Sequence, residues 1–98
     1  MKINETFSSP NFGDRVNSKI DMLVLHYTAM DDAKSAIERL CYIKTQVSSH
    51  YVISKQGEIY RLVDEAKRAW HAGQSYWRGV TDVNSHSIGI ELDNSGLD

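Results

Sequence analysis

The strongest constraint on the fold is a nearly continuous apolar segment, Ile20 to His26, which contains the uninterrupted run Met22-Leu23-Val24-Leu25. Strands that are covered on both faces of a sheet carry such runs, because side chains pointing either way must be apolar. The segment therefore predicts a central strand that is buried on both faces and ends at His26. The apolar run is far shorter than the roughly 20 residues that a membrane-spanning helix needs, so no membrane-spanning segment is expected.

A helix is predicted after this strand. Asp31 or Asp32 can cap its N-terminus, and the helical pattern runs to about Lys44. The apolar positions recur at intervals of three and four residues: Ala33, Ala36, Ile37, Leu40 and Cys41. Cys41 is the single cysteine, so it cannot form an internal disulfide. Its place on the apolar face favours a small buried side chain.

Two further strand regions follow from alternation and turn residues. Val47 to Ser54 and Glu58 to Val63 are rich in β-branched and aromatic residues, and Lys55-Gln56-Gly57 between them predicts a hairpin. Ser87 to Leu92 alternates strictly, which places Gly89 and Glu91 on one face of a strand. A glycine beside a carboxylate suggests that another group approaches this face closely.

The remaining segments show no regular period. Residues 1–19 contain the single proline and are predicted to be an irregular N-terminal arm. Residues 64–85 concentrate aromatic side chains among glycines and polar residues, which is typical of a functional loop. With 98 residues the chain is one domain in length. The pattern of strands and helices predicts an α/β fold, a mixed β-sheet flanked by helices.

The charge of the chain limits the partners that can be expected, and the composition of its first residues bears on its location. Eleven basic and thirteen acidic residues give a net charge of -2, and the basic residues are scattered. A nucleic-acid partner is therefore not expected, because its binding requires a concentrated basic face. No secretory signal is recognised in the first residues. Both a cytoplasmic and a periplasmic or cell-wall location stay open.

Four histidines, His26, His50, His71 and His86, are the candidate chemical groups. None has the local spacing of a metal motif, and no G-x-S-x-G element is present, so spacing alone predicts neither a metal site nor a serine nucleophile. Taken singly, each histidine is more often a hydrogen-bonded structural residue than a ligand.

Several blocks of the chain, in order across residues 20–94, nevertheless form a recognisable set: Leu25-His26-Tyr27-Thr28-Ala29, Ser48-Ser49-His50-Tyr51-Val52-Ile53, Gly57-Glu58-Ile59-Tyr60, Ala69-Trp70-His71-Ala72-Gly73, Asn84, and Ser87-Ile88-Gly89-Ile90-Glu91. Together these blocks resemble one enzyme family, the zinc-dependent N-acetylmuramoyl-L-alanine amidases of the phage-lysozyme-like and peptidoglycan-recognition type. The match of several separate blocks makes the resemblance specific.

The resemblance implies roles for individual residues. His26 corresponds to a zinc ligand of the family, and Glu91 corresponds to its catalytic acid or base. Trp70, His71 and Gly73 match the block that lines the substrate groove. His50 matches a position beside the site without a defined role, and His86 has no counterpart. The implied reaction is hydrolysis, by a zinc-activated water, of the amide between N-acetylmuramic acid and L-alanine in peptidoglycan or muropeptide.

The family's other two zinc ligands and an assisting lysine come from a later segment, so residues 20–98 resemble the N-terminal portion of an amidase domain. The remaining zinc ligands are expected outside this chain, supplied by a C-terminal complement, either a segment or a separate chain. Completion of a metal site by His50, His71 or Glu91 together with His26 is the less favoured arrangement. The alternative is a zinc-free peptidoglycan-binding module, or an inactive fragment that needs the complement.

Overall fold

The computed structural model describes residues 2–16, 19–27, 32–72 and 82–93. Its main feature is a five-stranded mixed sheet with the strand order β1-β5-β4-β7-β3. β4 is antiparallel to β5, whereas the other neighbouring pairs are parallel. The strands are β1 (Ile3–Asn4), β3 (Met22–Tyr27), β4 (Tyr51–Ile53), β5 (Ile59–Arg61) and β7 (Ser87–Leu92). A two-stranded antiparallel sheet pairs β2 (Phe12–Asp14) with β6 (Lys67–Ala69).

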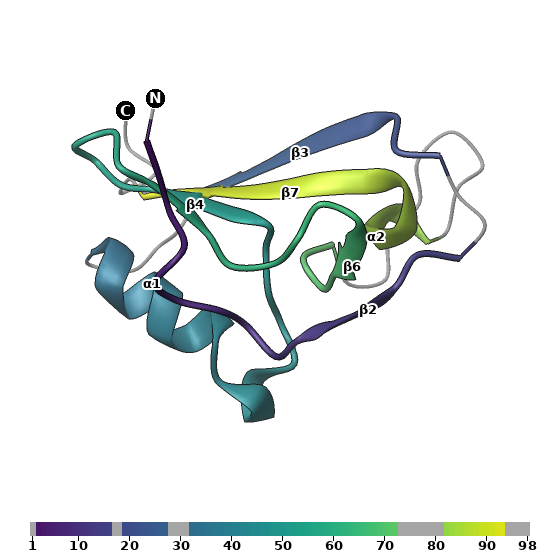
Figure 1. Cartoon of the computed structure of the whole chain (residues 1–98), viewed down its shortest axis with the longest axis horizontal. Helices are drawn as coiled ribbons and strands as arrows, with labels where there is room; N and C mark the ends of the chain where they lie inside the picture. Colours follow the sequence, from purple (N-terminus) through teal and green to yellow (C-terminus); the bar gives the residue numbers. More distant parts are fainter. Residues whose placement is uncertain (1, 17–18, 28–31, 73–81, 94–98) are drawn as a thin grey trace.

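Helix α1 (Ala33–Leu40) covers one face of the main sheet (Figure 1). The Asp32 carboxylate accepts a hydrogen bond from Ser35 N at 2.8 Å, which caps the helix as the sequence predicts. Ile37 and Leu40 bury their side chains with Val52 of β4 in the core. The helix is shorter than predicted, because a 3₁₀ turn, η1 (Ile43–Thr45), replaces its C-terminal end. Cys41 is half-buried at the C-cap.

The prediction of a central strand covered on both faces is wrong for β3. It pairs only with β7 in the described residues, and its side chains alternate in burial. Leu23, Leu25 and Tyr27 are 68%, 55% and 59% exposed. The apolar pattern misleads because only one face of the sheet is covered by the described elements (Figure 1). These three side chains, here called the open row, lie on the face opposite α1.

The N-terminal arm is also more ordered than predicted. It contributes β1 and β2, and side-chain hydrogen bonds of Asn11 and Arg15 fix it to the rest of the described structure. The Asn11 amide donates to Tyr42 O and to Val47 O, both at 2.9 Å. The Arg15 guanidinium donates to Asn84 O at 3.1 Å and to Ser85 O at 2.9 Å. Isolated polar residues that act in this way carry no periodicity, which explains why the sequence pattern did not predict it.

Residues 64–85, predicted to form a loop, contain β6 and the start of the single-turn helix α2 (Val83–His86). α2 leads directly into β7, so the segment ends at the strand that carries Glu91. The hairpin prediction is confirmed, since β4 pairs with β5 and Gly57 takes a positive φ of 85° in the turn. β7 has the predicted bounds, but its burial does not alternate: Ser87–Gly89 are buried and Ile90–Leu92 are half-buried.

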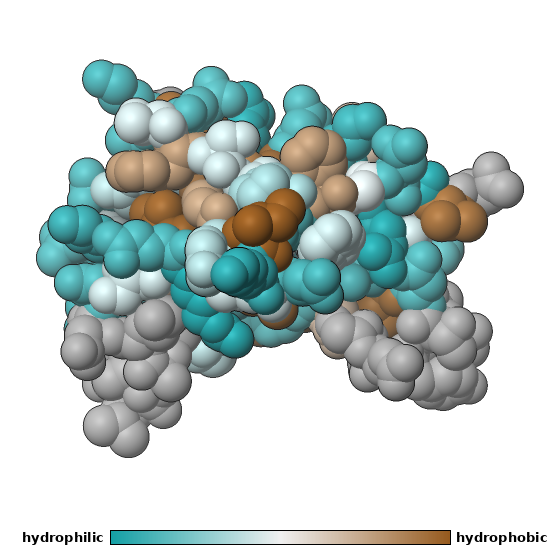
Figure 2. Space-filling view, turned by 90° about the horizontal axis from the view of Figure 1, so that it is seen from below, coloured by the Kyte–Doolittle hydropathy of each residue, from teal (hydrophilic) through white to brown (hydrophobic). Residues whose placement is uncertain are grey.

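Figure 2 views the molecule from the helix side, where hydrophilic residues surround a few apolar ones. No helix within the described part of the chain has the length and apolar character that crossing a membrane would require.

Candidate active site

Two residues of the candidate site are brought together by the pairing of neighbouring strands. In the parallel pair of β3 and β7, His26 is the partner of Glu91. Partnered residues of a parallel pair point to the same face. Glu91 is also the partner of Val52, which packs beneath α1. His26 and Glu91 therefore lie side by side on the helix-covered face, and each is half-buried.

His71 joins this pair from the segment after β6. Its Nδ1 lies 3.0 Å from His26 Nε2, and its Nε2 lies 2.9 Å from Ser87 Oγ. The two imidazole planes meet at 71°, an edge-on arrangement. The structure thus brings together the predicted ligand, the predicted acid or base, and one of the predicted groove residues.

The backbone around His71 is shaped to hold it. Asn84 Oδ1 accepts from His71 N at 3.1 Å and from Ala72 N at 2.9 Å. Gly89 leaves room for the ring, since a Cβ added there would lie 2.8 Å from His71 Nδ1. The close approach suggested by the glycine beside Glu91 is therefore that of a histidine ring. The glycine beside Glu91 predicted that some group approaches this face closely, but the sequence pattern did not indicate that the group is His71.

His50 is a fully buried residue between β7 and β6. Its Nδ1 accepts from Gly89 N at 3.0 Å, and its Nε2 lies 2.8 Å from Lys67 O. Because a carbonyl only accepts, Nε2 carries the proton and donates it to Lys67 O. His50 is thus a neutral imidazole that ties the site strand to the smaller sheet. His50 thus has the hydrogen-bonded, structural role that a single histidine most often has in a fold.

Burial shifts the pKa values of three groups at or beside the site, His71, His50 and Glu91. Burial lowers the pKa of His71 to about 3, assisted by repulsion from His26, His50 and two arginines. Burial also lowers the pKa of His50. Burial raises the pKa of the Glu91 carboxyl, an effect opposed by His26 and Arg39. A raised carboxyl pKa suits a group that must both take and return a proton near neutral pH.

The described residues do not by themselves form a complete metal site. No group of three or more His, Cys, Asp or Glu side chains in this part of the chain is arranged to hold an ion. His26 has the right chemistry for one zinc ligand, because an imidazole nitrogen is a common zinc donor. A closed or catalytic zinc site needs at least three protein ligands. The described residues therefore provide at most part of such a site.

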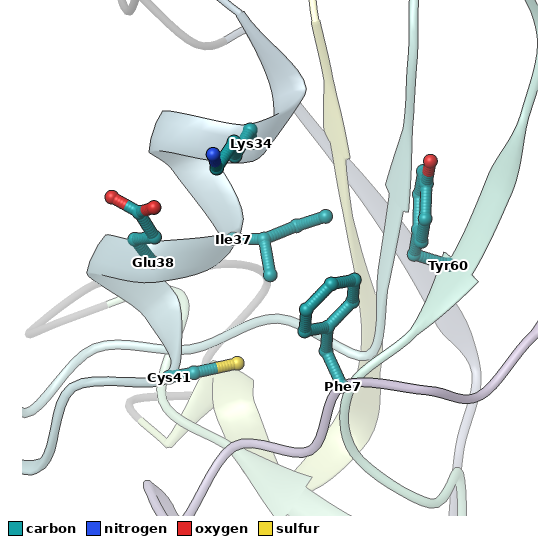
Figure 3. A pocket seen from close by; sticks show the side chains of 6 residues that line it. All are labelled: Phe7, Lys34, Ile37, Glu38, Cys41 and Tyr60. Carbon is teal, nitrogen blue, oxygen red and sulfur yellow. The ribbon is translucent and has the colours of Figure 1, made fainter.

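A separate pocket of about 400 Å³ lies on the other side of α1, between the helix, the N-terminal arm and β5. Figure 3 shows the rings of Phe7 and Tyr60 facing the helix side chains, among them Ile37 and Cys41. Burial raises the pKa of the Cys41 thiol, so little reactive thiolate forms at neutral pH. The pocket contains none of the three residues His26, His71 and Glu91.

A comparison with protein families decides the assignment. Residues 16–98 match the family model described as N-acetylmuramoyl-L-alanine amidase. The chain belongs to the N-acetylmuramoyl-L-alanine amidase family. The resemblance drawn from the sequence blocks is therefore confirmed, and the mixed sheet with helices agrees with solved structures of amidases.

Three comparisons with two relatives, AmiD and AmpD, show how much of an amidase this chain covers. The N-acetylmuramoyl-L-alanine amidase AmiD of Escherichia coli is 47% identical over a match 85 residues long, which covers 80% of this chain and 30% of AmiD. A crystal structure of an AmpD derivative matches with a TM-score of 0.81 at 28% identity, covering 93% of this chain and 61% of that one. The structure of E. coli AmiD with the substrate anhydro-N-acetylmuramic acid-L-Ala-D-gamma-Glu-L-Lys matches at 0.70 and 41% identity, covering 95% and 35%.

The chain thus spans less than two thirds of these amidases.

Of the predicted groove residues of the amidase family, Trp70 is half-buried, and its indole Nε1 would meet a Cβ added to Gly13 at 3.9 Å. Gly73 lies outside the described residues. His86 sits at the end of α2, and its carbonyl accepts from Asp21 N. Ser87, Asn84 and Gly89 complete the surroundings of His71, and only their presence in the matching blocks could have indicated this.

Proposed function

We propose that this chain supplies the N-terminal part of an amidase active site that hydrolyses the amide between N-acetylmuramic acid and the L-alanine of the stem peptide. The observation that carries the proposal is the register pairing of His26 with Glu91 on one sheet face. A ligand-type imidazole and a carboxyl of raised pKa on neighbouring strands suit acid-base hydrolysis of an amide.

In this proposal Glu91 is the general acid and base. It takes a proton from the attacking water and returns it to the departing amine of L-alanine. Glu91 lies on β7, which is paired on both sides, with β3 and with β4, and this pairing holds the carboxyl rigidly. Burial supports the role, since it keeps the protonated form accessible closer to neutral pH.

His26 is proposed as the zinc ligand that this chain contributes. When bound, zinc lowers the pKa of a coordinated water and makes hydroxide available at neutral pH. The remaining donors are proposed to come from residues outside the described part of the chain. Trp70, His71 and Gly73 are proposed to border the groove that receives the substrate.

The substrate class is proposed to be a muropeptide. A solved structure of E. coli AmiD is a complex with the substrate anhydro-N-acetylmuramic acid-L-Ala-D-gamma-Glu-L-Lys, and 95% of this chain aligns with that structure. We therefore propose that this chain acts on anhydromuramyl or muramyl peptides. Its Glu91 and His26 would face the lactyl amide.

A C-terminal complement is part of the proposal. The open row leaves three large apolar side chains of β3 in solvent, which is unusual for a finished domain. AmpD, whose structure this chain matches best in TM-score among those described above, is longer than the matched region. A complement that covers the open row and adds the missing zinc donors would account for both observations.

A second candidate, from the class of binding modules, is a zinc-free unit that holds peptidoglycan without cleaving it. It is favoured by one observation, namely that the described residues contain no group of three metal-ligating side chains. The two candidates differ in their product. An amidase releases a peptide that begins with L-alanine, whereas a binding module retains intact muropeptide.

The test is an activity assay on a chimera in which this chain is followed by the part of E. coli AmiD beyond the matched residues. With zinc present, the chimera should release L-alanine-headed peptide from anhydromuramyl tripeptide. The AmiD part alone serves as the control. Binding of muropeptide with no release, in a folded chimera that holds zinc, would contradict the amidase proposal and favour the binding module.

A further inference from the structure

The hydrogen bonds around His71 determine where its proton sits. Ser87 Oγ lies 2.7 Å from Val83 O and 2.9 Å from His71 Nε2. A hydroxyl has one proton, and a carbonyl can only accept. Ser87 therefore donates to Val83 O, and its oxygen accepts from His71 Nε2. His71 thus carries its proton on Nε2 and presents a lone pair at Nδ1.

The hydrogen bond to His71 also fixes where the proton of His26 sits. Its Nε2 lies 3.0 Å from the lone pair of His71 Nδ1, so this nitrogen must be the donor. A neutral His26 with a proton on Nε2 has its lone pair on Nδ1. The chain of bonds from Val83 O through Ser87 and His71 therefore selects one of the two neutral forms of His26.

We propose that His71 is a positioning residue that fixes the ring orientation and the tautomer of His26, and that Ser87 fixes His71 in turn. This role differs from the groove-lining role that the family resemblance implies for His71. Metal-bound histidines commonly donate their second ring N–H to a fixed acceptor, which sets the nitrogen left for the metal. Here the acceptor is a second imidazole.

The surroundings of His71 support this role, because three groups fix the ring independently of any ligand. Asn84 holds its backbone N–H at 3.1 Å, and Gly89 provides a surface without a Cβ against the ring. His50, whose ring centroid is 6.2 Å from that of His71, accepts a hydrogen bond at Nδ1 from the backbone N–H of Gly89 and so holds Gly89 in place. A ring that only contacted substrate would not need its own tautomer to be set by a buried serine.

The inference rests on the proposed function only for its catalytic meaning, since the tautomer of His26 can be measured without activity. The experiment is nitrogen-15 NMR of the imidazoles in this chain, recorded well above the ordinary imidazole pKa. We expect His26 to carry its proton on Nε2 in the unsubstituted chain. A proton on Nδ1 of His26 would overturn the proposal outright.

Two matched variants separate the two hydrogen bonds of His71. In His71→Asn the side-chain oxygen can take the place of Nδ1 and accept from His26, whereas in His71→Gln the amide reaches the place of Nε2 beside Ser87. We expect His71→Asn to keep His26 in the Nε2–H form and His71→Gln to release it into a mixture of both forms. Equal spectra of His26 in the two variants would contradict the role.

Ser87→Ala is the second route, because it leaves the His71 ring in place and removes the acceptor of its Nε2 proton. We expect part of the His71 population to move its proton to Nδ1, and His26 to change its form correspondingly. His86→Asn is the control, since His86 lies outside these bonds. A chimera without amidase activity but with these spectra would disprove the proposed function and leave the positioning role intact.

Discussion

Gly89 lies against the His71 ring so closely that a Cβ at position 89 would come within 2.8 Å of His71 Nδ1. Real Cβ atoms do not approach other atoms to this distance, so a side chain at position 89 would displace the ring. The ring in turn holds His26 at 3.0 Å. Because Gly89 of β7 has no side chain, the His71 ring can lie where it holds His26 of β3.

Gly89→Ala is therefore expected to destabilise the fold and to break the contact between the two histidines. Overpacking of this kind costs about 1 to 3 kcal/mol. Urea unfolding gives the change in free energy, and imidazole NMR reports the contact. Gly13→Ala is the matched control, because a Cβ there would meet Trp70 Nε1 at an ordinary 3.9 Å. An unchanged His26 spectrum in Gly89→Ala would contradict the expected displacement.

Glu91→Gln is expected to lower amidase turnover of the chimera by roughly 10²- to 10⁴-fold, the usual contribution of a positioned acid or base. The amide is isosteric, so fold and zinc content should be kept. Release of L-alanine-headed peptide measures the effect, with zinc determined on the same sample. Glu38→Gln, on the exposed side of α1, is the control. Near-normal turnover would remove Glu91 from the mechanism, and loss of zinc would instead mark it as a ligand.

The chain alone is expected to bind zinc weakly, because His26 is the single ligand that the family motif supports within it. Calorimetric titration of zinc into the purified chain measures this. Stoichiometric submicromolar binding that His26→Ala abolishes and His86→Ala retains would mean that a complete site exists within these residues. The proposal of donors supplied by a complement would then be wrong.

The open row is expected to make the isolated chain self-associate. Replacing Leu23 and Leu25 together by threonine should reduce association, since threonine keeps the strand preference and removes exposed apolar surface. The double change to valine, which stays apolar, is the control. Analytical ultracentrifugation over a range of concentrations measures the effect. A compact monomer of the unsubstituted chain with a sharp cooperative melt would contradict the proposed need for a complement.

Stability is expected to fall as the pH drops below the ordinary imidazole pKa of about 6.5. Burial lowers the pKa of His50 in the fold, so the unfolded chain binds a proton first. The stabilisation is complete above the unfolded pKa and is lost as the pH falls toward the lowered one. His50→Asn can still accept from Gly89 N and does not titrate. Urea melts at several pH values should show a weaker pH dependence for this variant than for the unsubstituted chain.

Elements defined by periodic patterns were predictable from the sequence, since β7, the hairpin and the start of α1 follow from alternation, turn residues and a capping aspartate. The open row was not, because an apolar strand looks the same whether or not its second face is covered. The polar contacts of the N-terminal arm leave no periodic signal either. The pairing of His26 with Glu91 depends on strand order, which no local pattern specifies.

The site residues show the same division. Family blocks indicated His26, His71 and Glu91, and the structure brings these three together. The blocks contain no information on hydrogen bonds, so the contact of His71 with Ser87 and its direction follow from the structure alone. His50, whose role was open, is explained by its contacts to Gly89 N and Lys67 O, which are far away in sequence.

The strand order also dictates when the protein can fold during its synthesis. β7 lies between β4 and β3, yet it is the last of these strands in the chain. Until Ser87–Leu92 has left the ribosome, Met22–Tyr27 lacks the one strand with which it pairs among the described residues, so its backbone N–H and C=O groups bond to water instead. Pairing between strands so distant in sequence is slow. The strand β3, at the edge of the described sheet, is therefore expected to become ordered only after β7 has been synthesised.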